Sequence, residues 1–339
     1  MKRSIEIDYA KGFAILILLL SHCMGEENVL KTWISSWNMP IFFIICGLIH
    51  QLRNPDGLPL DNLKTWCKRR IIQIFIPYFT FSLLYILFLN GLSWISEGKT
   101  NMLNECISII TMHGIASMWF LPIYFFSEIL YVFFIARFSS IIRFLFVIIV
   151  IILITLLQYN IKISTDKIIS LFLKISIALS FVTCGGLFSK CFLQVRFPIH
   201  FILISLLISS IIALYNGFIG IGALLLNNVV LFFITGIIMS YTIIMLFKII
   251  NENINSKYLN ILSSFGANSI VVLVTNNLLI ELFRLLEYNF FNNFFLANGV
   301  IGAFLMTIIL TIPEYYLISI SQNKKIGILF GKGINKIRQ

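Results

Sequence analysis

The feature that most constrains this chain is a series of about ten apolar runs, each long enough to cross a membrane. A membrane-spanning helix needs ~20 predominantly apolar residues to cross ~30 Å of hydrocarbon. Hydrophobic residues fill 59% of the 339 positions and charged residues only 12%, so the chain is far more apolar than a soluble domain. The sequence therefore predicts an all-α, polytopic membrane protein with residues 1–339 in one domain. The expected spans lie near residues 12–30, 33–51, 71–92, 117–135, 141–158, 169–188, 197–215, 229–249, 259–283 and 299–320.

The lysines and arginines predict the orientation, because cytoplasmic connections carry an excess of both. One alternating set of connections holds Lys2, Arg3, Lys11, Arg53, Lys64, Lys68, Arg69, Arg70, Arg137, Arg143, Lys190, Arg196, Lys248, Lys257, Lys324, Lys325, Lys332, Lys336 and Arg338. The opposite set holds only Lys31, Lys99, Lys162, Lys167 and Arg284. Ten spans place both termini on one side, and this asymmetry predicts that the side is cytoplasmic. Topology therefore accounts for most of the net charge of +11, without a nucleic-acid partner.

Several other classes of feature are not predicted. The six cysteines show no metal-ligand spacing and suggest no disulfide framework, so no metal site is expected. The basic start followed by an apolar run imitates a signal peptide, but without a small-residue cleavage site it should be an uncleaved first anchor. The longest outer connection, near residues 93–116, is too short for a soluble domain.

The first apolar run carries polar side chains in a pattern that suggests chemistry. Lys11 and His22 are eleven residues apart, which places them within ~20° of one helical face and ~16 Å apart along it. Asp8 lies on the same side if the helix extends back so far. A histidine within a span either hydrogen-bonds inside the bundle or acts on substrate, and its reference pKa near 6.5 suits proton transfer.

Other polar positions have both a structural and a functional interpretation. Pro40 and Gly47 in the second span suit a kinked helix with an interfacial Trp37, or backbone carbonyls freed for a ligand. Arg69 and Arg70, at the start of the third span, suit an orientation signal or a phosphate ligand.

The fourth and ninth spans carry further polar groups. Trp119 suits an interfacial belt, whereas a buried Glu128 must be neutral, paired or facing water. Asn276 and Asn277 suit hydrogen bonds between helices. His50, His113 and His200 lie at span ends or in loops and carry no comparable spacing signal.

Together these patterns resemble the acyltransferase 3 family of integral membrane acyltransferases. Five matches occur in family order over about 270 residues: Asp8, Lys11 and His22; Trp37 to Gly47; Arg69, Arg70, Pro77 and Tyr78; Trp119 to Leu121; and Gly266 to Ser269. The order Asp8-x-x-Lys11-Gly12 is most similar to the fucose-O-acetylase-like subgroup. One departure is Asn276, where many members carry a histidine, and an amide cannot act as an acid or base near neutral pH.

The resemblance implies a multi-pass O-acetyltransferase of the bacterial inner membrane, with acetyl-CoA as donor substrate and no permanently bound cofactor. The implied acceptor is a hydroxyl of a surface polysaccharide (O-antigen, capsule or exopolysaccharide) or of its lipid-linked precursor. Catalysis would fall to His22, Lys11 and Asp8, with His22 as proton acceptor or acetyl carrier. Binding of CoA would fall to Arg69, Arg70, Arg3 and Trp119, and Lys11 would share in holding the CoA phosphates.

Two other functions are alternatives to this one, and the first of them, a transporter, shares the number of spans. A polysaccharide transporter or flippase without enzymatic activity would typically show inverted repeats of broken helices, and no convincing repeat is seen. An O-antigen polymerase would need a large basic outer loop, whereas the outer loops here are short and poor in lysine and arginine.

Overall fold

The computed structural model describes residues 4–25, 27–97, 101–158, 167–253, 259–290 and 293–332, and within these ranges the chain is helical apart from one isolated β-bridge. Nine segments in the described part are long and apolar enough to cross a membrane. They confirm the all-α, multi-pass prediction. Their bounds are Val29–Arg53, Asn62–Ser93, Ala116–Arg137, Ser140–Gln158, Lys167–Gln194, Ile199–Asn216, Val229–Asn253, Ser269–Phe290 and Gly299–Ile320.

The first predicted span has different bounds in the structure. Helix α1 runs Ile5–Cys23, seven residues earlier at its start than the expected 12–30, and it is not among the nine segments. Glu6, Asp8 and Lys11 lie in its first two turns, so every stretch of 18 residues in this 19-residue helix contains three charged side chains. The orientation of the termini stays a prediction, since it depends on counting α1 as a span.

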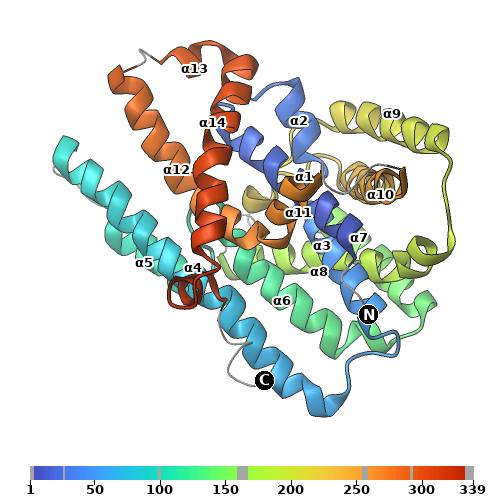
Figure 1. Cartoon of the computed structure of the whole chain (residues 1–339). Helices are drawn as coiled ribbons and strands as arrows, with labels where there is room; N and C mark the ends of the chain where they lie inside the picture. The colour runs from blue at the N-terminus through green and yellow to red at the C-terminus, as the bar shows by residue number, and fades with distance from the viewer. Residues whose placement is uncertain are drawn as a thin grey trace. The chain divides into compact units, whose positions relative to one another are not determined.

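The chain divides into two compact units, each built from separate stretches of sequence. Residues 1–59 and 126–269 form the first unit, and residues 60–125 and 270–339 form the second. The first unit holds α1, α2 (Val29–Ser35), α3 (Asn38–Arg53), the later turns of α6 (Phe120–Phe133), α7 (Ser140–Gln158), α8 (Lys167–Gln194), α9 (Ile199–Asn216), α10 (Val229–Asn253) and α11 (Asn260–Ala267) (Figure 1). The second holds α4 (Leu60–Glu97), α5 (Met102–Ile110), the first turns of α6, α12 (Ser269–Phe290), α13 (Phe294–Ala297) and α14 (Gly299–Ile320).

Glycines let two helix pairs of the first unit touch backbone to backbone. A Cβ added at Gly47 of α3 would lie 1.8 Å from the carbonyl oxygen of Val182 on α8, and one at Gly185 would lie 1.9 Å from that of Ile44. Helices α1 and α11 meet in the same way at Gly12 and Gly266, side by side (Figure 1). Small residues are the usual means of close packing in membranes, so these glycines fix both pairs.

The start of α3 is built for packing. Pro40 is the third residue of α3, where its missing N–H has no partner to lose, so it starts the helix without kinking it. Trp37 is fully buried instead of interfacial and stacks on Phe13 of α1, with ring centroids 6.0 Å apart. The side-chain amide of Asn38 donates to the carbonyl of Ala14 at 2.8 Å. These contacts attach α3 to α1.

In the second unit, α4 begins eleven residues before its predicted start at residue 71. Its later turns lie beside α5 (Figure 1). The Tyr78 hydroxyl donates to the Ile109 carbonyl at 2.8 Å, and the Asn90 amide donates to Glu105 at 2.6 Å. The predicted outer connection therefore contains an amphipathic helix that docks on α4.

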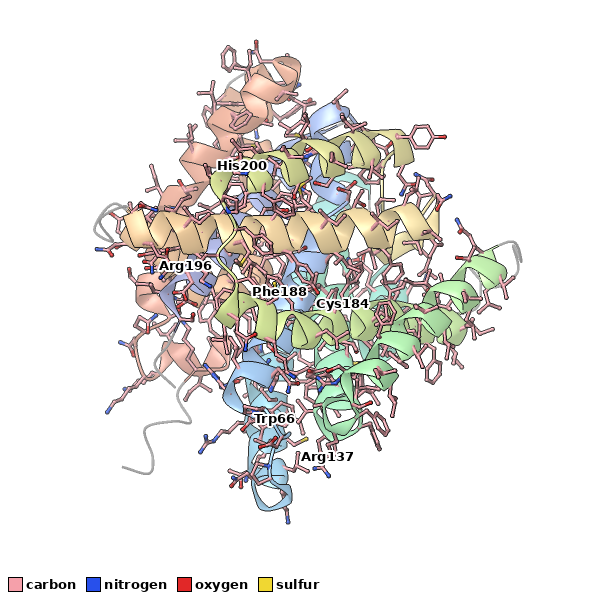
Figure 2. The ribbon with its side chains drawn as sticks, turned by 90° about the vertical axis from the view of Figure 1, so that its right-hand side faces the viewer. Trp66, Arg137, Cys184, Phe188, Arg196 and His200 are labelled. Carbon is pink, nitrogen blue, oxygen red and sulfur yellow. The ribbon has the colours of Figure 1, made fainter. Side chains whose placement is uncertain are left out.

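A cavity of about 680 Å³ lies among α7, α8, α9 and α10 of the first unit. Cys184 and Phe188 project into it from α8 (Figure 2). The Phe188 ring stacks on Tyr241 of α10, with centroids 3.9 Å apart. The lining of the cavity is almost wholly apolar and comes mostly from four membrane-spanning segments. The cavity therefore suits a hydrocarbon ligand.

Candidate active site

Helix α1 presents the predicted polar stripe. Asp8, Lys11 and His22 all belong to it, so the stripe spans ~60° of the helix surface and ~21 Å of its length. Asp8 is only 8% exposed, whereas Lys11 and His22 are half-buried. The acidic residues fall in the first turn and His22 in the last, where the helix dipole favours negative and positive charge respectively. The structure thus brings the three predicted catalytic residues onto one face.

The stripe is held by the packing of α1 against its neighbours in the first unit. The Asp8 carbonyl lies against Gly266 of α11, 1.8 Å from where a Cβ would stand. Gly12 makes the reciprocal approach to Leu262. The glycine of the late Gly-x-x-Ser pattern therefore positions α1.

The predicted CoA-binding residues lie in less uniform surroundings. Arg3 lies outside the described residues. Arg69 and Arg70 lie nine and ten residues into α4 instead of preceding a helix. Arg69 is exposed, whereas Arg70 lies over the Tyr124 ring at 5.8 Å and donates to Gln73 at 2.9 Å. Adjacent helical residues diverge by ~100°, so the two guanidinium groups differ in setting.

Trp119 ends a short 3-10 helix, Ala116–Trp119, that α12 holds in place. The Ser117 hydroxyl donates to the Leu273 carbonyl at 3.2 Å and accepts from the Asn277 amide at 2.6 Å. Met112, before this helix, and Ala116, its first residue, have φ values of 62° and 49°. Left-handed backbone at residues other than glycine is strained and clusters at functional sites. Trp119 itself is half-buried, and its part in binding CoA stays a prediction.

The ninth predicted span is broken in the structure. Helix α11 ends at Ala267 and α12 begins at Ser269, with Asn268 between them. Asn276, which stands where many members of the resembled family have histidine, is fully buried on α12. Asn277 beside it bonds Ser117, as the hydrogen-bonding interpretation of these amides predicts.

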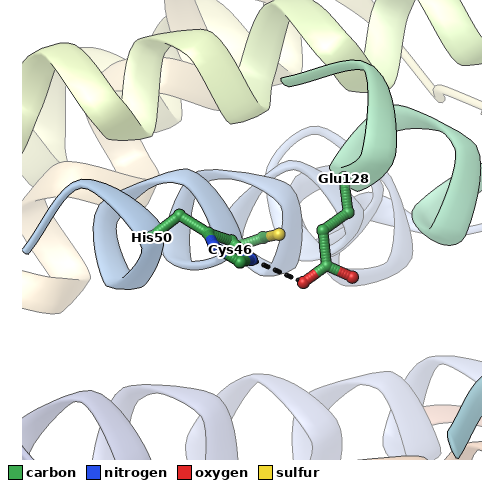
Figure 3. Close-up of side chains that lie close together, drawn as sticks. All are labelled: Cys46, His50 and Glu128. Atoms are coloured by element: carbon green, nitrogen blue, oxygen red, sulfur yellow. Dashed lines mark hydrogen bonds and ion pairs between the residues drawn. The ribbon is translucent and has the colours of Figure 1, made fainter. Parts of the chain in front are cut away.

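A second polar centre, which the sequence patterns did not predict, lies at the far end of α3. The Nε2 atom of His50 lies 2.7 Å from a carboxylate oxygen of Glu128 on α6, and Cys46 lies next to both (Figure 3). Glu128 is 2% exposed and is paired, one of the three states predicted for it. His50 falls within the span Val29–Arg53, so His22 is not the only histidine in a membrane segment. The signal that was available is the Cys46-x-x-x-His50 spacing, which places both on one helical face.

Comparison with known proteins defines the class. A family model described as an acyltransferase domain matches residues 4–316, and its span includes every predicted site residue except Arg3. With nine membrane-spanning segments in the described part, the chain is a membrane-embedded acyltransferase. It belongs to the acyltransferase 3 family, as the five motifs suggested. No curated protein and no solved structure matches it.

The predicted site residues fall into two groups. Asp8, Lys11 and His22 belong to the first unit, whereas Arg69, Arg70 and Trp119 belong to the second. That both groups serve one site stays a prediction.

Proposed function

We propose that this acyltransferase moves an acetyl group from acetyl-CoA to a hydroxyl of a surface polysaccharide or its lipid-linked precursor, in a bacterial inner membrane. The observation that carries the proposal is the stripe of Asp8, Lys11 and His22 on α1. It places a titratable imidazole on the same helical face as an ammonium ~16 Å away and a carboxylate ~21 Å away, in a family that transfers acyl groups.

Two routes through His22 transfer the acetyl group with atoms balanced. As a general base, His22 takes the proton of the attacking hydroxyl, the oxygen attacks the thioester carbonyl, and the proton passes to the departing CoA thiolate. As a carrier, His22 attacks the thioester with a ring nitrogen and releases CoA thiolate; the acceptor oxygen then takes the acetyl group from His22, and its hydroxyl proton passes to the thiolate. Lys11, ~16 Å from His22 along the helix, would hold CoA phosphates, and Asp8 would pair with Lys11 or Arg3.

The cationic groups of the second unit suit the CoA phosphates. Guanidinium groups bind phosphates through paired, charge-assisted hydrogen bonds. Arg70 is held over Tyr124 while Arg69 faces outward, so Arg69 has the freer side chain for a diffusing ligand. Lys11 and Arg3 complete the proposed phosphate-binding set.

The apolar cavity of about 680 Å³ supports a lipid-linked acceptor, because a membrane-embedded hydrocarbon chain matches its lining. Ser205→Trp, which places an indole inside the cavity, should lower transfer to a lipid-linked acceptor and spare transfer to a soluble sugar. Leu207→Trp on the same helix is the matched control, since Leu207 is 62% exposed and does not line the cavity. Equal rates for the two variants would argue against a lipid chain there.

The test of the proposed activity is His22→Ala, compared with His200→Ala at an exposed position on α9. General acid–base groups contribute ~10²–10⁴-fold, so His22→Ala should lose transfer by that factor while still reaching the membrane. Mass spectrometry of surface polysaccharide from strains that carry only each variant measures this. Normal acetylation with His22→Ala would refute the assignment.

A second measurement separates the two roles of His22. Purified protein incubated with acetyl-CoA and no acceptor should gain the mass of one acetyl group on His22 if that residue is a carrier, and should gain none there if it is a general base.

A further inference from the structure

The cluster of Cys46, His50 and Glu128 has the chemistry of a metal site. One ligand atom from each residue, a thiol sulfur, a ring nitrogen and a carboxylate oxygen, lies within 4.8 Å of the other two (Figure 3). Cys46 and Glu128 are 3% and 2% exposed. Both helices that supply them belong to membrane-spanning segments, where ionisable groups are costly and usually functional.

The distances suit a tetrahedral ion of the zinc type. Such an ion lies ~2.3 Å from sulfur and ~2.0–2.2 Å from nitrogen and oxygen, which separates its ligand atoms by ~3.3–3.6 Å. The 2.7 Å between His50 Nε2 and the Glu128 carboxylate oxygen is shorter than this separation. The largest separation that the three ligand atoms can have in the cluster, 4.8 Å, is longer. The ligand atoms therefore need to change their separations by only about 1 Å to surround such an ion.

Charge also favours such an ion. A carboxylate is expensive to bury in a medium of low dielectric constant unless it is paired or bound to a metal. One thiolate and one carboxylate neutralise a divalent cation, so the bound cluster carries no net charge. Binding releases the Cys46 thiol proton to bulk solvent, and the proton of the His50–Glu128 hydrogen bond moves to the other ring nitrogen or to solvent, so that His50 supplies a lone pair and Glu128 a carboxylate oxygen.

Neighbouring hydrogen bonds fix the helices that carry the ligands. Gln51, next to His50, accepts from the Tyr131 hydroxyl at 2.9 Å and from Arg143 at 2.7 Å. Tyr131 lies one turn after Glu128 on α6, and Arg143 belongs to α7. This network links α3, α6 and α7. In metal sites such surrounding hydrogen bonds hold the ligand side chains in position.

We propose that Cys46, His50 and Glu128 bind a divalent transition-metal ion of the zinc type, with a fourth position open to water or another oxygen ligand. Three protein ligands with an open position are the pattern of sites that act on substrate, whereas closed structural sites use four. The proposal is independent of the acetyl donor and acceptor.

The test uses the full-length protein purified in detergent. Zinc content is measured by elemental analysis, and Co²⁺ is then titrated into chelator-treated protein and followed by its visible and sulfur-to-metal absorption. We expect about one metal ion per chain. Replacement of an outer partner of a metal ligand costs ~10–100-fold in affinity, so loss of a ligand in Cys46→Ser should cost at least ~100-fold.

Two further variants keep the test decisive. Glu128→Gln keeps the size of the side chain and should weaken binding as Cys46→Ser does, whereas Cys184→Ser removes a buried thiol of the same unit outside the cluster and should not. Absence of saturable Zn²⁺ or Co²⁺ binding to the parent protein would overturn the proposal. So would equal affinity in the parent, Cys46→Ser and Glu128→Gln proteins. An acetyl group found on Cys46 after treatment with acetyl-CoA, without saturable metal binding, would make the thiol an acyl carrier and also overturn it.

Discussion

Replacing Gly12 with alanine should impair catalysis by moving helix α1, without touching any reacting group. Gly12 follows Lys11 and faces α11. A methyl group there would lie 1.9 Å from the Leu262 carbonyl oxygen, whereas ordinary contacts begin at 3.4 Å. The obstructing atom is backbone and cannot rotate away, so α1 and α11 must separate by roughly 1.5 Å, at a cost of ~1–3 kcal/mol in stability.

The displacement carries Asp8, Lys11 and His22 with it, because all three belong to α1. A misplacement of about 1 Å can cost ~10²-fold in rate even when it arises outside the reacting groups. We therefore expect Gly12→Ala to lower kcat/KM for acetyl transfer by ~10²-fold. The assay is acetyl transfer from acetyl-CoA by purified protein, with a thermal unfolding midpoint measured in the same detergent.

Gly91→Ala is the matched control. Gly91 belongs to α4, and a Cβ there meets nothing within 4 Å, so this variant should keep its activity and its unfolding midpoint. The reasoning fails if Gly12→Ala and Gly91→Ala prove equal to the parent in both rate and midpoint, because the close approach of α1 to α11 would then carry no constraint.

Three further outcomes are expected. Arg69→Lys/Arg70→Lys should weaken acetyl-CoA binding in calorimetry, since lysine lacks the fork that makes charge-assisted bonds worth ~1.5–3 kcal/mol each; unchanged affinity would leave the pair as an orientation signal. Single cysteines in a cysteine-free background should be labelled from inside at position 64 and from outside at position 99, which lies outside the described residues, and the reverse pattern would overturn the predicted topology. Burial lowers the pKa of the Lys332 ammonium to about 8, so between pH 8 and 10 the unfolded chain binds more protons at this residue than the folded chain does. The free energy of unfolding should therefore rise with pH over this range. The unfolding midpoint of Lys332→Met should show no such rise.

The sequence by itself determined the membrane-spanning segments and the polar stripe of α1. Both follow from local rules: apolar runs of sufficient length partition into a bilayer, and an eleven-residue spacing returns to the same helical face. Motif order likewise identified the family before any coordinates, because the matched residues recur at fixed short intervals. Two helix starts were predicted too late, because the Lys11 and Arg69 regions are helical although charged, and charge alone does not end a helix. The break at Asn268 inside the ninth predicted span was also not predicted.

Only the tertiary structure decided which distant residues meet. His50 and Glu128 are 78 positions apart, and their 2.7 Å approach depends on the relative rotation and height of α3 and α6. The close packing at Gly47 and Gly185 sets the placement of α3 against α8. In the sequence, each of these glycines shows only that the position has no side chain, and not which helix packs against it. Helical periodicity fixes the face a residue occupies on its own helix, whereas packing between helices fixes what that face meets, so the Cys46, His50 and Glu128 centre came from the fold.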